Sequence, residues 1–222
     1  MLNIFSNFEG AEVIIVFLAF FVAIIAAITL HEFAHAFVAH KQGDLTPKSY
    51  GRLTLNPMAH IDPIGMLMLL LVGFGWAKPV PVNPLKFKHY RRGFFLVSVA
   101  GIIVNIILFL LFTSLNILIV GGKIPLNIDT SLGLFIFYTI QFLITINLSL
   151  AIFNILPIAP LDGFNMLSAV SRFDSKFIKF MRENGQWVLL ILLISGLLGR
   201  IIFAVYDFIA IPVTEFLTNL LL

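Results

Sequence analysis

The amino-acid sequence predicts an all-α polytopic membrane protein with about four full transmembrane helices, a re-entrant segment, a short extended hairpin or loop, and a proline-broken helix. The 222 residues are 60% hydrophobic and only 11% charged, whereas soluble domains carry roughly a quarter charged residues. Apolar stretches long enough to cross a bilayer recur along the chain. We expect one membrane-embedded unit over residues 1–222, with a core of about 11–171 and then an interfacial helix and a last span over 172–222.

The basic residues indicate how this unit is oriented. They gather in three short segments: Lys41, Lys48 and Arg52; Lys78, Lys86, Lys88, Arg91 and Arg92; and Arg172, Lys176, Lys179 and Arg182. Clusters of this kind stay on the inner side of a membrane, so all three are expected to face the cytoplasm. Because they do not share one amphipathic face, we expect the lipid bilayer as a partner and no nucleic acid.

The first span is expected over Ala11–Leu30, where Glu12 is the only charged residue. The helical pattern continues through His40, and Gly43 offers a place to stop. Met1–Gly10 contains no Lys or Arg, so this first apolar segment is expected to be retained rather than cleaved as a signal peptide.

The next apolar segment, Ile61–Trp76, is short and is interrupted by Gly65, Gly73 and Gly75. If this segment crossed the bilayer fully, the second basic cluster would lie on the outer side. Both facts favour a re-entrant segment, which a membrane tolerates where protein or a cavity covers its backbone.

Two further spans are expected over Gly93–Val120 and Ser131–Phe153, joined by a turn at Gly121–Thr130. The apolar residues of Phe173–Asn184 recur at helical spacing while the charged ones face away, which predicts an interfacial helix. Gln186–Ile211 then supplies the last span.

The first candidate site lies at the end of the first span, where His31, Glu32 and His35 form the pattern H-E-x-x-H. On a helix the two imidazoles lie one turn apart on one face, where both can bind one zinc ion while Glu32 activates a water as general base. The alternative is a group of buried polar residues that hydrogen-bond between helices. Ionisable side chains in a span cost on the order of 2.5–3.5 kcal/mol each, so three together need a compensating partner.

A catalytic zinc site needs three protein ligands and one open position, so the two histidines leave one ligand to find. The chain has no cysteine, and most of its carboxylates lie in loops or at distant helix ends. Asp162 differs, because it follows an apolar stretch broken by Pro157 and Pro160 that returns to the depth of the histidine pair. It opens a short helix expected over Leu161–Val170, so a helix cap is its alternative role.

The two patterns, in this order, resemble the signatures of the site-2 protease family of intramembrane zinc metalloproteases. The second pattern is Asn154–Gly163, with the sequence N-I-L-P-I-A-P-L-D-G. The segments Gly51–Pro57 and Gly75–Pro84 resemble a compact prokaryotic branch of that family, without PDZ or regulatory domain. The likeness covers most of Thr29–Gly163 and constrains the last span only weakly.

The resemblance implies a zinc metalloendopeptidase that cuts a transmembrane protein substrate in a prokaryotic plasma membrane. It implies that His31, His35 and Asp162 bind Zn2+ and that Glu32 activates water. It also implies that Asn154 contacts the substrate or its developing oxyanion, since an amide donor can stabilise that charge. A hydrogen bond between helices is the alternative role of this asparagine.

Val80 and Val82 alternate with Pro79 and Pro81 in a segment that offers a template for an extended substrate. The prolines remove N–H donors from one edge, which leaves the two valines to pair along the other edge. We expect this edge to accept an unwound substrate by strand addition. A proline-rich loop without that role is the alternative.

Two other functions fit part of the sequence. Intramembrane His, Asp and Glu also mark ion or proton-coupled transporters, but the chain shows no paired halves with matching interrupted spans. A non-catalytic zinc-binding membrane scaffold would need the ligands but not Glu32, which is present. We do not assign His40, His60 or His89 to zinc, and the sequence leaves the oligomeric state and the substrate's identity open.

Overall fold

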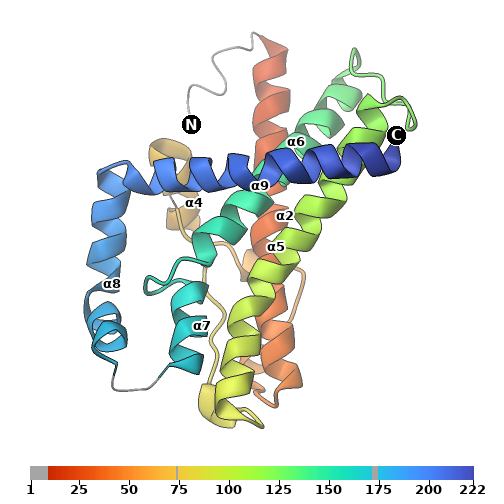
Figure 1. The fold of residues 1–222 in the computed structure, drawn as a ribbon. Coiled ribbons are helices and arrows are strands. Elements are labelled where there is room, and N and C mark those ends of the chain that lie inside the picture. The colour runs from red at the N-terminus through yellow and green to blue at the C-terminus, as the bar shows by residue number, and fades with distance from the viewer. Residues whose placement is uncertain (1–9, 74, 172–174) are drawn as a thin grey trace.

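Three long helices form the core of the protein, whose computed structural model is mainly helical (Figure 1). They are α2 (Ala11–Lys41), α5 (Tyr90–Val120) and α6 (Ser131–Asn154), and each packs against the other two. The structure describes residues 10–73, 75–171 and 175–222. The turn between α5 and α6 falls at residues 121–130, as the sequence predicts.

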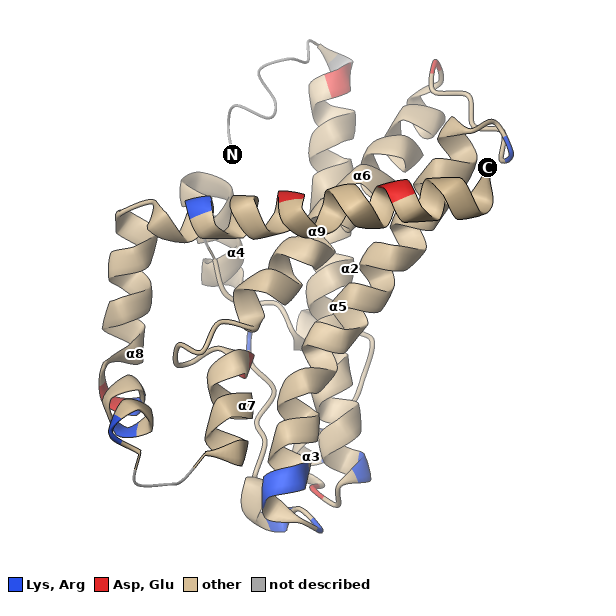
Figure 2. Ribbon diagram, in the orientation of Figure 1, with Lys and Arg blue, Asp and Glu red and all other residues tan. Residues whose placement is uncertain are grey.

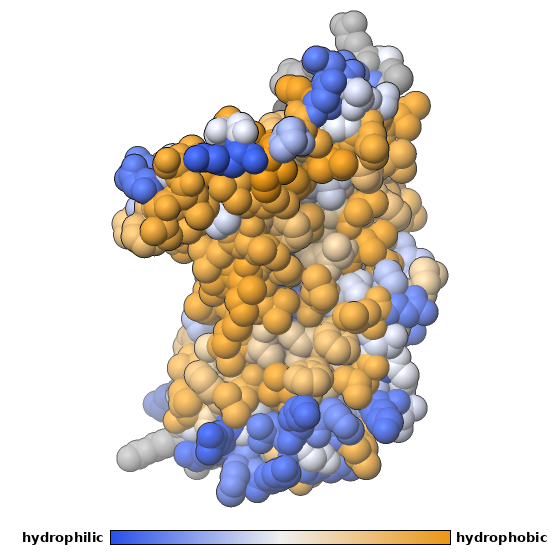
Figure 3. All heavy atoms as spheres, turned by 90° about the vertical axis from the view of Figure 1, so that its right-hand side faces the viewer, coloured by the Kyte–Doolittle hydropathy of each residue, from blue (hydrophilic) through white to orange (hydrophobic). Residues whose placement is uncertain are grey.

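Four of the described helices are long and apolar enough to cross a membrane by length and composition: the three core helices and α9 (Leu197–Leu221). The face of the molecule seen in Figure 3 carries a broad hydrophobic region between two more hydrophilic ends. These features confirm the predicted all-α polytopic membrane fold.

The two ends of the bundle differ in charge (Figure 2). One end, called here the basic end, carries the loop that follows α2, with the short helix α3 (Thr46–Ser49), and the beginning of α5. The other, called here the opposite end, carries the loop between α5 and α6. The 3-10 turns η1 (Pro57–Ala59) and η2 (Pro84–Lys86) lie in the connections between α2 and α5. The cationic beginning of α8 (Lys176–Ile194) lies toward the basic end (Figure 2).

The re-entrant segment contains one short helix, α4 (Pro63–Val72). Ile61 and Ala77 form an antiparallel bridge, so the chain enters and leaves this segment at the same level. Its return leg touches its outgoing leg at two glycines: a Cβ on Gly75 would lie 2.1 Å from the carbonyl oxygen of Gly65. The predicted partial span is therefore confirmed, and the close approach explains why glycines interrupt it.

The break after α6 leads into α7 (Asp162–Val170), one residue shorter than the helix expected there. The connecting loop folds back over the first turn of α7. A Cβ on Gly163 would lie 2.1 Å from the carbonyl oxygen of Ile155, so only glycine allows this approach. The fold-back sets the position of Asp162.

The C-terminal part differs from the prediction. The interfacial helix expected over Phe173–Asn184 does not end there: α8 continues to Ile194, and residues 172–174 lie outside the described part. The chain turns at Gly196, whose φ of 70° is one that side-chain-bearing residues rarely adopt. The predicted span Gln186–Ile211 is therefore wrong in its bounds, because this turn divides it between α8 and α9.

Candidate metal centre

The two histidines of the H-E-x-x-H pattern lie side by side on α2, near its basic end. His31 and His35 are both buried, and their Nε2 atoms are 3.0 Å apart. The one-turn spacing on a continuous helix produces this arrangement.

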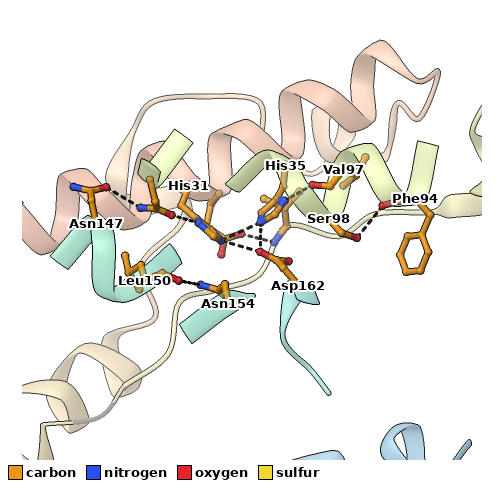
Figure 4. Close-up of polar contacts among 12 residues, drawn as sticks. His31, His35, Phe94, Val97, Ser98, Asn147, Leu150, Asn154 and Asp162 are labelled. Atoms are coloured by element: carbon orange, nitrogen blue, oxygen red, sulfur yellow. Dashed lines mark hydrogen bonds and ion pairs between the residues drawn. The ribbon is translucent and has the colours of Figure 1, made fainter. Parts of the chain in front are cut away.

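Asp162 completes the group from the first turn of α7. Its Oδ2 lies 3.3 Å from Nε2 of His31 and 3.1 Å from Nε2 of His35 (Figure 4). Together these residues form a group that could hold a metal ion. The carboxylate that the sequence singles out therefore meets the histidine pair, although the re-entrant segment and two long helices, α5 and α6, separate them along the chain.

The hydrogen bonds on the far side of each ring fix which nitrogen carries a proton. Nδ1 of His35 is 2.7 Å from the carbonyl oxygen of Val97, which can only accept, so Nδ1 donates. Nε2 of the neutral ring is then an unprotonated acceptor that faces the carboxylate. The same protonation follows for His31 from a longer chain of contacts.

That chain consists of two buried asparagines. Nδ1 of His31 donates to Oδ1 of Asn105 over 2.5 Å, and Nδ2 of Asn105 donates to Oδ1 of Asn147 over 2.8 Å. Nδ2 of Asn147 donates to the carbonyl oxygen of Leu143 over 2.7 Å. Because the last acceptor is a carbonyl, the direction of every bond in the chain is determined.

Three acceptor atoms therefore converge on one point. Among the described residues, Oδ2 of Asp162 is buried without a hydrogen-bond donor, and acceptors at such distances repel each other unless a cation lies between them. Ligand atoms around a tetrahedral zinc ion lie about 3.3–3.4 Å apart, close to the 3.0–3.3 Å found here. The three ligand atoms and the distances between them fit a zinc ion.

Gly101 on α5 provides the space beside the two rings. A Cβ at this position would lie 2.4 Å from Cε1 of His31 and 2.6 Å from Nε2 of His35. Gly101 and Asn105 are one helical turn apart, so the same face of α5 makes room for the rings and orients one of them. Sequence analysis missed Gly101, Asn105 and Asn147, although an asparagine in the middle of each of two apolar spans was a visible signal.

Glu32 lies next to this group and is half-buried. Its Oε2 accepts a hydrogen bond from the backbone N–H of Val80 over 3.1 Å, and a carboxylate keeps further acceptor positions for a water. Glu32 lines a cavity of about 340 Å³ together with the three candidate ligands.

The other candidates from the sequence line the same cavity: Val80, Val82 and Asn154. Asn154 ends α6 and donates from Nδ2 to the carbonyl oxygen of Leu150 over 3.0 Å, a bond within the helix rather than between helices (Figure 4). Its second amide hydrogen can serve another acceptor. All seven predicted site residues thus surround one cavity, while their contacts with a substrate stay predictions.

The proline-valine segment is extended but differs in one respect from the expectation. The N–H of Val80 donates to Glu32 instead of being available along an edge. The Val82 side chain packs against Ala39, Phe87 and Val97. Within the described part of the chain, the backbone N–H of Val82 has no hydrogen-bond acceptor. The segment ends at Asn83, whose N–H donates to Oδ2 of Asp44 over 2.7 Å.

A helical membrane bundle that brings H-E-x-x-H together with a distant carboxylate has the architecture of a membrane-embedded metalloprotease. The chain is 44% identical over 146 residues to a Bacillus subtilis (strain 168) protein named "Putative zinc metalloprotease YwhC", with 66% of each chain covered. It is 31% identical over 184 residues to "Putative zinc metalloprotease Rip2" of Mycobacterium tuberculosis (strain ATCC 25618 / H37Rv), covering 78% of this chain and 66% of the relative.

The chain belongs to the site-2 protease family with these relatives. The matches span just under two thirds of the relatives' own length. No family model matches the chain, and no solved structure matches it.

Proposed function

We propose that the protein is an intramembrane zinc metalloprotease that hydrolyses peptide bonds within or near transmembrane segments of other membrane proteins. The observation that carries this proposal is the convergence of two imidazole nitrogens and one carboxylate oxygen, 3.0–3.3 Å apart and next to Glu32. The relatives' names support a zinc metalloprotease.

His31, His35 and Asp162 would hold the zinc ion. When bound, zinc acts as a Lewis acid that lowers the pKa of a water and polarises the scissile carbonyl. Glu32 accepts a proton from the attacking water and passes it to the leaving amine nitrogen. The free amide hydrogen of Asn154 can donate to the carbonyl oxygen as negative charge develops there.

An apolar cavity of about 590 Å³ adjoins the site and offers a route for a lipid-embedded substrate. It is lined by His31, Glu32 and Asn154 and by apolar residues of α2, α4 and α8, among them Ile28, Met66 and Leu189. A helical segment that enters here must unwind before its carbonyls are exposed. The extended segment that contains Val82 lies at the site to receive it.

The proposed orientation places the basic end, and with it the catalytic site, toward the cytoplasm of a prokaryotic cell. Basic clusters at this end support it through the positive-inside rule. The metal group lies in the part of α2 nearer to that end.

The Glu32→Gln variant tests this function. Purified wild type and variant are compared for bound zinc and for cleavage of a model transmembrane peptide in detergent or liposomes. We expect equal zinc and at least a hundredfold loss of cleavage, since general base catalysis contributes about 10²–10⁴ in rate. Glu183→Gln, the same change on the outer face of α8, is the matched control and should keep both properties.

The same experiment separates the alternative functions. A transporter would bind no stoichiometric zinc and cut nothing. A scaffold would bind zinc, but neither wild type nor variant would cut. Cleavage by Glu32→Gln at the wild-type rate would contradict the proposed role of Glu32.

A further inference from the structure

Helix α9 does not run alongside the core helices. It crosses over α5 and α6 at a large angle (Figure 1), and its residues Ile202 and Ile209 pack against a core cluster of Phe109, Leu148 and Ile152. The chain arrives through α8, which rises from the basic end to the level of α9 (Figure 1).

The far end of α9 lies at the opposite end of the bundle as well. A Cβ on Gly121, at the last turn of α5, would meet the Leu222 side chain at 2.4 Å. A helix of 25 residues is about 37 Å long, so it could reach the basic end if it ran parallel to α5. Instead it runs crosswise, so that its beginning and its end lie at a similar level (Figure 1).

The side chains of α9 are arranged for a boundary between water and apolar surroundings. Arg200, Asp207 and Glu215 fall within an arc of about 80° on an ideal helix, roughly opposite the face that packs on α5 and α6. Figure 2 shows the charged residues of α9 along its upper edge, toward the opposite end. The flank between these faces exposes large apolar side chains, with Phe208 82% and Phe216 65% exposed.

A membrane-crossing α9 would place Asp207 near the middle of the hydrocarbon. Among the described residues, no ion pair or hydrogen bond involves its carboxylate. An unpaired carboxylate at that depth costs on the order of 2.5–3.5 kcal/mol, and it would be exposed to lipid rather than to protein. The charge pattern therefore opposes a crossing.

We infer that α9 does not cross the bilayer but lies in the headgroup region of one leaflet, at the opposite end of the molecule. The polar arc contacts water and lipid headgroups, and the flank with Phe208 and Phe216 enters the acyl region of that leaflet. The C-terminus then lies on the same side of the membrane as the loop between α5 and α6.

Single-cysteine variants test this placement directly, because the chain has no cysteine of its own. Arg200→Cys, Asp207→Cys and Glu215→Cys are treated with a membrane-impermeant maleimide, before and after the membrane is permeabilised. Lys123→Cys marks the opposite end and Lys48→Cys marks the basic end. Phe208→Cys reports the flank that faces lipid.

We expect all three polar-arc variants to react from the same side as Lys123→Cys, and Phe208→Cys to react at least tenfold more slowly. Labelling of Arg200→Cys and Glu215→Cys from different sides would overturn the inference, as would an Asp207→Cys that stays unreactive after permeabilisation. A C-terminal epitope tag gives an independent reading in the otherwise unchanged chain, since its exposure on the Lys48 side would also overturn it.

Discussion

The protonation of His31 depends on side chains that never touch the metal position. Asn105 and Asn147 are fully buried in the bundle, and they carry a directed set of hydrogen bonds from the ring to a backbone carbonyl of α6. An outer hydrogen bond of this kind fixes the orientation and tautomer of a histidine ligand. The metal centre therefore depends on four helices, because its ligands come from α2 and α7 and their support from α5 and α6.

Replacing Asn105 by leucine removes the acceptor for Nδ1 of His31 while keeping a side chain of similar size. We expect zinc affinity to fall about 10–100-fold, the usual effect of losing an outer-sphere partner. Competition with a chelator of known affinity measures this change.

Asn116→Leu is the matched control for this variant. Asn116 also lies on α5 and accepts an interhelical hydrogen bond, from Gln141 over 2.8 Å, but it is remote from the metal group. Equal losses of affinity in the two variants would show a general effect on helix packing and would contradict the positioning role of Asn105.

At the scale of elements, a buried aspartate anchors the segment that borders the cavity. Asp44 accepts hydrogen bonds from the backbone N–H of Thr46 over 2.9 Å and of Asn83 over 2.7 Å. Burial by itself would raise the pKa of Asp44, but these hydrogen bonds and the nearby charge of Lys86 lower it below its ordinary value. The ionised carboxylate thus ties the end of α2 to the end of the extended segment.

This anchor makes stability depend on pH. Because the pKa of Asp44 is lower in the folded than in the unfolded protein, its contribution is complete above the unfolded value of about 3.9 and is lost as pH falls through the folded value. We expect the difference in melting temperature between wild type and Asp44→Asn to be largest near neutral pH and to shrink below about pH 4. Melting curves in detergent at several pH values measure it, with the exposed Asp129→Asn as control, and a difference that grows in acid would contradict the assignment.

The extended segment also permits a test of substrate pairing that avoids Glu32. Val82→Pro removes a backbone N–H that has no acceptor within the described part of the chain. A proline at Val80 would instead remove the hydrogen bond to Glu32. If Val82 pairs with an unwound substrate, we expect cleavage to fall about tenfold, the worth of one lost hydrogen bond, with zinc content unchanged.

Val82→Ala separates the N–H from the side chain. It keeps the donor but loses packing against Ala39 and Phe87. The pairing role predicts that the alanine variant cuts faster than the proline variant, and equal rates in the two would count against it.

The sequence predicts some elements closely and others poorly, for identifiable reasons. The ends of α5 and α6 match because polar and glycine-containing residues interrupt long apolar runs at Gly121–Thr130. The C-terminal elements do not match, because the amphipathic pattern and the apolar run that follows Gln186 form one continuous helix. The chain turns only at Gly196, and the backbone conformation there is known from the structure alone.

The candidate site follows the same division. His31, Glu32 and His35 carry a local pattern, and Asp162 stands out as a carboxylate after a proline-broken stretch, so all four could be found along the chain. The roles of Gly101 and Asn147 depend on which helices contact each other, and these contacts cannot be read from a single sequence.

At the scale of the whole molecule, the hydrophobic region and the more hydrophilic ends determine the orientation of the bundle in a membrane (Figure 3). The core helices, the re-entrant α4 and the crosswise α9 leave the metal group inside the bundle, toward the basic end. The placement of α9 inferred above belongs to this scale, since it decides on which side of the membrane the chain ends.

The separation of the metal ligands along the chain also bears on biosynthesis. The helix that bears the histidine pair emerges from the ribosome first, and the aspartate follows only after two further long helices have been made. Until then the nascent chain holds an incomplete set of ligands. The proposed protease is therefore expected to stay inactive toward itself and its neighbours during insertion, and to become active only once most of its own fold has been assembled.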